Sequence, residues 1–112
     1  MNNEIHGKDS VILSINTSDN KEIILKLTIN GKEKIIREKI ERGKSQLVLL
    51  LIEKILMENE KQLSDMTDKI VHIGPGSFTG LRVGISIANA LAYSLHIPVN
   101  NLPIGTFVTP QY

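Results

Sequence analysis

The sequence predicts a single α/β domain over 1–112, with the element order β-β-β-α-β-α-β and a mixed sheet covered by helices. Three observations support this order. Apolar and polar residues alternate over 22–29, the apolar period lengthens to that of a helix after Gly43, and a turn rich in glycine and proline follows a short apolar segment at Gly74. A chain of 112 residues is long enough to bury a modest core.

Composition excludes several classes of protein. The formal net charge of +1 does not by itself predict nucleic-acid binding, and the absence of cysteine excludes disulfides and thiolate metal sites. The first nine residues form a polar extension, and the longest uninterrupted apolar run, 47–52, is too short to span a bilayer. We therefore expect a cytoplasmic protein without membrane contact.

Two strands and a hairpin open the predicted sheet. Val11–Asn16 forms the first strand, and Glu22–Ile29 forms the second, with Ile23, Leu25, Leu27 and Ile29 on one face. Asn30-Gly31 favours a type I′ turn, because both residues tolerate a positive φ. The third strand is expected to return antiparallel over Lys34–Glu41.

The third strand is rich in basic residues. Between Gly31 and Lys44 there are six basic side chains and three acidic ones; the basic residues are Lys32, Lys34, Arg37, Lys39, Arg42 and Lys44. They either contact RNA or guard an exposed edge strand against pairing. We favour the edge strand.

A helix is expected from Ser45, which can cap it, to Asn59. It carries more apolar residues than the single stripe of a typical surface helix. One face holds Val48, Leu51, Ile52 and Ile55, and beside this face lie Leu47, Leu50 and Lys54. The excess indicates either a second partner or a helix that is central to its own core.

A polar connection over Gln62–Asp68 leads to a fourth strand at Lys69–Ile73 and a second helix at Thr79–Leu95. This helix carries small residues at a spacing of four: Gly80, Gly84, Ala88 and Ala92. We call these four residues the small-residue ridge. Glycine inside a helix lowers stability by about 1 kcal/mol relative to alanine, so the ridge indicates that another backbone packs closely against it. The first helix, the sheet and another protein are all candidate neighbours.

The turn between the fourth strand and the second helix is a candidate anion site. Free backbone N–H groups at a helix start favour negative charge, and the residues placed to contact an anion or nucleotide are Gly74, Gly76, Ser77, Thr79 and Arg82. The turn matches neither a Walker loop nor a dinucleotide loop. Arg82 either clamps an anion or pairs with an acidic side chain at the surface.

Residues for catalysis or metal binding are not predicted. His6, His72 and His96 lie far apart and lack the spacing of a metal site. Asn16 ends the first strand, where a phosphotransferase of the actin and hexokinase type holds its metal through an aspartate. We expect no catalytic residue, metal or cofactor.

The residues of Gly74–Arg82, with Val83-Gly84 and Leu91-Ala92-Tyr93 after them, resemble the signature of the TsaB (YeaZ) family. Ile12–Ser18 resembles the opening Ile-Asp-Thr-Ser motif of that family, and Ile97-Pro98-Val99 resembles its strand after the second helix. Together these segments cover Val11 to Val99. The tail at 102–112 stays unassigned.

The resemblance implies an actin-like fold of the ribonuclease H-like class, of which this chain is the first half. It also implies a scaffold without catalytic activity, which pairs with TsaD. TsaD transfers a threonylcarbamoyl group to the adenosine beside the anticodon of tRNA, with the TsaE ATPase as a further partner. In the family, the two helices contact TsaD, or a second TsaB in a homodimer. The residues expected at this interface are Leu47, Leu50, Leu51, Lys54, Gly80, Gly84, Ile87, Ala88, Leu91 and Ala92.

Three departures limit what the resemblance carries over. Asn16 stands where the family usually has aspartate, Lys44 stands where it often has histidine, and the second half is missing. Two alternatives follow: a glycoprotease-like or nucleotide-binding enzyme of the same fold, and a truncated product that no longer serves the pathway.

Overall fold

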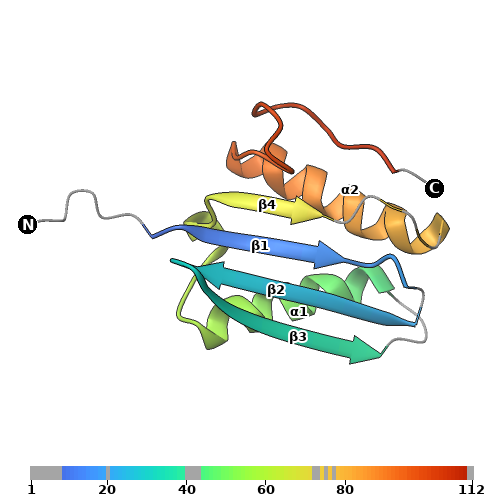
Figure 1. Ribbon diagram of the computed structural model, residues 1–112, viewed down its shortest axis with the longest axis horizontal. Coiled ribbons are helices and arrows are strands. Elements are labelled where there is room, and N and C mark those ends of the chain that lie inside the picture. Colours follow the sequence, from blue (N-terminus) through green and yellow to red (C-terminus); the bar gives the residue numbers. More distant parts are fainter. Residues whose placement is uncertain are drawn as a thin grey trace, which may run out of the picture.

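The computed structural model describes residues 9–19, 21–39, 44–71, 74, 76 and 78–110 (Figure 1). Strands β1 (Val11–Asn16), β2 (Glu22–Ile29) and β3 (Lys32–Lys39) form an antiparallel meander. Helix α1 (Lys44–Glu58) and a short 3-10 turn, η1 (Leu63–Asp65), lead to β4 (Asp68–Val71), and α2 (Phe78–Leu95) follows. The predicted order of these elements is confirmed as far as α2, whereas no strand follows α2 among the described residues.

The third strand begins two residues earlier than predicted. Asn30 and Gly31 both have positive φ, 50° and 86°, as the type I′ turn requires. A two-residue turn places Ile29 directly opposite Lys32, so pairing resumes at once and β3 (Lys32–Lys39) begins at residue 32 instead of 34. The predicted end at residue 41 lies outside the described residues. The hairpin prediction is confirmed, and the boundary is corrected by the shortness of the turn.

The sheet is mixed, with strand order β3-β2-β1-β4 and β4 parallel to β1. Strand β3 is therefore an edge strand, and its basic side chains at Lys32, Lys34, Arg37 and Lys39 are exposed, which agrees with the edge-strand interpretation. Figure 1 shows both helices behind the sheet, α1 behind β2 and β3 and α2 along β4.

The core lies between the sheet and the helix pair. Alternate residues of β1 and β2 are buried, namely Val11, Leu13, Ile15, Ile23, Leu25 and Leu27. The predicted inner face of α1 is confirmed, since Val48, Leu51, Ile52 and Ile55 are all buried against this layer. Helix α2 adds Leu81, Ile85, Ala88 and Ala92.

The small-residue ridge of α2 packs against the chain's own sheet. A Cβ added at Gly84 would clash with the Thr17 Oγ1 atom and lie 3.3 Å from Ile15 Cγ2. The fully buried Thr17 hydroxyl donates a hydrogen bond to the Gly80 carbonyl oxygen (2.5 Å) and accepts one from the Gly84 N–H (3.1 Å). The sheet is therefore the neighbour that requires glycine at position 84.

The predicted start of a fifth strand is reduced to a single bridge residue, Val99. Beside it, the Asn100 side-chain amide pairs with the edge of β4: its Oδ1 accepts from the Val71 N–H (2.8 Å) and its Nδ2 donates to the Val71 carbonyl (3.0 Å). A side chain thus makes the hydrogen bonds that a neighbouring strand would make.

The previously unassigned tail turns back along α2. The Asn89 amide exchanges two hydrogen bonds of 3.0 Å with the backbone of Val108, whose side chain is buried. The rings of Tyr93 and Phe107 meet edge to face at 6.1 Å. The tail therefore covers the flank of α2 that faces away from α1 (Figure 1).

Removing the Thr17 hydroxyl should destabilise the fold. Thr17→Val keeps the shape of the side chain but removes both buried hydrogen bonds to α2, so we expect the free energy of unfolding to fall by about 1–3 kcal/mol in urea denaturation. The matched control is Thr28→Val on the half-buried face of β2, expected within about 0.5 kcal/mol. Equal stability of the two variants would contradict the assigned role of Thr17.

Adding a methyl group at Gly84 tests the packing of the ridge. Gly84→Ala should lower the free energy of unfolding by about 1–3 kcal/mol, because the new Cβ meets Thr17, although alanine is the better helix former. Ser86→Ala, at an exposed position of the same helix, should not destabilise. In the double variant Thr17→Ala/Gly84→Ala the losses should be less than additive; simple additivity would show that these residues do not touch.

Candidate functional site

The segment after β1 and the glycine-rich turn before α2 lie at the same end of the molecule. Strands β1 and β4 are parallel, so both carboxyl ends lie at the same edge, beside the first turns of α2 (Figure 1). This edge of a parallel pair is where α/β proteins commonly bind ligands. The segment after β1 and the turn before α2 are therefore brought together.

Asn16 shapes the segment that follows β1. Its Oδ1 accepts hydrogen bonds from the Ser18 N–H (3.0 Å) and the Ser18 hydroxyl (2.7 Å), which is an Asx turn. A carboxylate oxygen could accept the same two bonds, so this turn does not require an amide. Asn16 thus has a structural role here that the search for a metal ligand did not predict.

The glycine-rich turn packs directly on Ser18. A Cβ added at Gly76 would lie 2.6 Å from the Ser18 Cβ and 2.9 Å from the Ser18 carbonyl oxygen, so only glycine fits without a shift. Gly74 has a φ of 144°, which also favours glycine. Two of the predicted anion-site residues therefore have a packing or backbone reason to be glycine.

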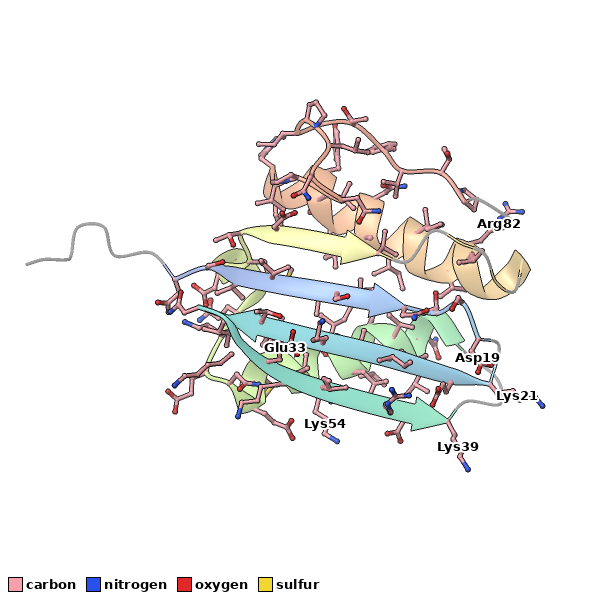
Figure 2. The ribbon with its side chains drawn as sticks, in the orientation of Figure 1. Asp19, Lys21, Glu33, Lys39, Lys54 and Arg82 are labelled. Carbon is pink, nitrogen blue, oxygen red and sulfur yellow. The ribbon has the colours of Figure 1, made fainter. Side chains whose placement is uncertain are left out.

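The structure describes only part of the remaining residues predicted to contact an anion. Ser77 and the side chain of Thr79 lie outside the described residues, as do His6 and His72. Arg82 is exposed, and Figure 2 shows it projecting from α2 at the end of the molecule that also holds Asp19 and Lys21. The anion site therefore stays a prediction.

Several predicted interface residues prove to belong to the chain's own core. Five residues of that set are buried in the folded chain: Leu51, Gly80, Gly84, Ala88 and Ala92. Their burial gives these residues a role in the chain's own core, and their assignment to an interface stays a prediction. The other residues of that set remain accessible: Leu50 and Lys54 are exposed, and Leu47, Ile87 and Leu91 are half-buried.

One accessible apolar surface lies on the outer side of α1, and its Leu49 faces Leu91 of α2 across a groove. Leu49, Leu50 and Met57 are 48%, 61% and 76% exposed, although all three are large apolar residues. A groove lined by Leu49, Ile52, Glu53, Leu63 and Leu91 runs between α1 and α2. We call this surface the helix-pair face, defined by Leu49, Leu50, Glu53, Met57, Leu63 and Leu91.

Sequence reasoning found part of the helix-pair face and missed the rest. It placed Leu50 and Leu91 there but did not name Leu49, Met57 or Leu63. Leu49 and Met57 lie two turns apart on one line of α1, a signal that the inner-face pattern beside them obscured. Leu63 lies in η1, beyond the end of α1, so helical spacing gave no information about it.

The described residues include neither a helix that could span a membrane nor a cluster of metal-ligand side chains. No helix there is both long and apolar enough to cross a membrane. No group of three or more histidine, cysteine, aspartate or glutamate side chains gathers there as metal ligands do.

Comparison with known proteins identifies the family. Residues 23–103 match the family model described as "TsaD: tRNA N6-adenosine threonylcarbamoyltransferase". The chain is 36% identical over 93 residues to the tRNA threonylcarbamoyladenosine biosynthesis protein TsaB of Buchnera aphidicola subsp. Schizaphis graminum, and 30% identical over 92 residues to TsaB of Bacillus subtilis. These matches cover 80% of this chain in both cases, and 42% and 39% of the relatives.

Solved structures agree with the sequence matches. YeaZ from Pseudomonas aeruginosa superposes with a TM-score of 0.76 at 30% identity, over 84% of this chain and 44% of that one. The chain therefore spans about two fifths of the length of the relatives it matches. The actin-like fold class expected from the sequence is confirmed. By these matches, the chain belongs to the TsaB (YeaZ) family, within the wider group that the TsaD family model describes.

Proposed function

We propose that this chain is a non-catalytic scaffold subunit in the biosynthesis of threonylcarbamoyladenosine in tRNA. It docks a TsaD-like threonylcarbamoyltransferase through the helix-pair face, and through that enzyme it works with the TsaE ATPase and tRNA. The pathway is supported by the names of the relatives, which are tRNA threonylcarbamoyladenosine biosynthesis proteins TsaB.

The exposure of large apolar side chains on α1 carries the proposal. Leu50 and Met57 stand more than half exposed although the inner side of the same helix already supplies the core. Burying apolar surface releases about 25 cal/mol per Å², so such side chains favour association. Contiguous apolar surface of this kind is typical of protein–protein interfaces.

The position of the surface agrees with docking by helix packing. Leu91 of α2 lines the same groove as Leu49 of α1, so the two helices together present one face. A partner helix pair can lie against it without disturbing the sheet. A homodimer through this face is the alternative occupant when no partner is present.

A second candidate function is contact with a nucleotide at the carboxyl ends of β1 and β4. It is favoured by the close packing of Gly76 on Ser18, which brings two backbone turns and the start of α2 to one edge. The exposed Arg82 guanidinium lies at the same end of the molecule (Figure 2).

Co-purification tests the scaffold proposal. The chain should form a stoichiometric complex with the TsaD-like protein of its own organism, seen by light scattering of the mixture and of each protein alone. Leu50→Lys and Met57→Lys should each weaken the complex by about tenfold or more, because a charge then replaces a buried apolar contact. Ile35→Lys is the matched control, since Ile35 is 56% exposed but lies on β3, away from the helices.

Two results would contradict the scaffold proposal. One is a well-folded monomer that forms no complex, which favours the truncated product. The other is a complex that Ile35→Lys weakens as much as Leu50→Lys does, which moves the interface off the helix-pair face.

Calorimetric titration with ADP tests the second candidate. Nucleotide contact at this edge predicts measurable binding that Arg82→Gln weakens by about tenfold. Lys54→Gln, an equal loss of charge at an exposed position of α1, should leave binding unchanged. Absence of heat with the wild-type chain at millimolar ADP would eliminate this candidate.

A further inference from the structure

Glu53 is a single carboxylate within the apolar helix-pair face. The groove between α1 and α2 is lined by Leu49, Ile52, Glu53, Leu63 and Leu91. A second groove, at the end of α1, is lined by Glu53, Leu56, Met57, Lys61, Gln62 and Leu63. Glu53 and Leu63 line both, so a segment that fills the two grooves must pass over the Glu53 carboxylate.

No basic side chain among the described residues forms an ion pair with this carboxylate. Within the described residues, the ion pairs are Lys26–Glu33, Arg37–Glu22 and Lys61–Asp9, and none of them includes Glu53. Lys61 is the basic residue that lines the second groove, but its Nζ lies 2.6 Å from the Asp9 Oδ2. This hydrogen bond raises the pKa of Lys61 and lowers that of Asp9, so the two groups hold each other in the charged state.

Docking over Glu53 would remove water from its carboxylate. A charge that loses its water without gaining a partner is strongly unfavourable, whereas a charge that meets its opposite is tolerated and fixes the orientation of the complex. An apolar partner without a cation would therefore be rejected at this position. The partner must bring the positive charge itself.

The spacing along α1 limits the shape of the partner. Leu49, Glu53 and Met57 follow each other at intervals of four residues, so they form one line along the helix, about 12 Å long. The complementary surface is a helix with one basic residue and an apolar residue about one turn to either side of it.

We propose that the helix-pair face binds an amphipathic helix of its partner that carries a lysine or arginine, flanked by apolar residues, opposite Glu53. This inference rests on the proposed scaffold function and adds the charge of the partner. Glu53 selects the partner, while Leu49, Leu50 and Met57 supply the apolar contact.

Charge reversal at Glu53 tests the inference. The affinity of the chain for the TsaD-like protein of the same organism is measured by calorimetry at low and high NaCl. Glu53→Lys should weaken binding by about tenfold or more, and Glu53→Gln by several-fold. Raising NaCl should weaken the wild-type complex more than the Glu53→Gln complex.

Glu58→Lys is the matched control. It makes the same change of charge on the same helix, at an exposed position that lines neither groove, and should alter the affinity by less than about twofold. All three variants should keep the thermal unfolding midpoint of the wild type, because both glutamates are exposed.

The outcomes separate this inference from the proposed function. A complex that Leu50→Lys weakens, but in which Glu53→Lys and Glu58→Lys behave alike, would overturn the inference and leave the scaffold function intact. No complex at all would overturn both. A homodimer that Met57→Lys dissociates, and that persists with the TsaD-like protein present, would place a second copy on the face and overturn the inference.

Discussion

The contact between Thr17 and the glycines of α2 determines where the rest of the functional surface lies. The Thr17 hydroxyl, one residue after β1, is fully buried and bonds to the backbone of α2 at Gly80 and Gly84. Because Gly84 has no side chain, the helix axis can approach the sheet closely. The same contact brings the start of α2, and with it Gly76, against the segment after β1. One buried side chain thus positions both candidate sites.

This packing divides the surface of α2 among its neighbours. One side contacts the sheet through Gly84, and another carries Asn89, whose amide holds the tail by the backbone of Val108. The side toward α1 carries Leu91, which stays half-buried beside Leu49. That side continues into the helix-pair face, whereas the flank covered by the tail carries the exposed rings of Tyr93 and Phe107. The helix-pair face is therefore what remains after the chain has satisfied its own core.

Local chemistry predicted most of the fold. Both β1 and β2 were predicted at their observed bounds, β2 from its alternation, and the positive φ tolerated by Asn30 and Gly31 predicted the hairpin. Helical periodicity identified the buried face of α1, because four residues with the same spacing face the same sheet. The predicted start of β3 was wrong by two residues, since spacing alone does not show how soon pairing resumes after a turn.

The parts that sequence reasoning missed are pairings between residues far apart in the chain. Asn100 replaces a neighbouring strand at Val71, and nothing in the residues around Asn100 indicates it. Gly84 illustrates this limit. The stability that glycine costs inside a helix indicates that a neighbouring segment packs closely, but this cost is the same whether the neighbour belongs to a partner or to the chain itself. Only the parallel placement of β4 beside β1, which carries α2 over Thr17, distinguishes the two. A small-residue ridge is therefore evidence of close packing, and topology decides whether that packing is internal or belongs to an interface.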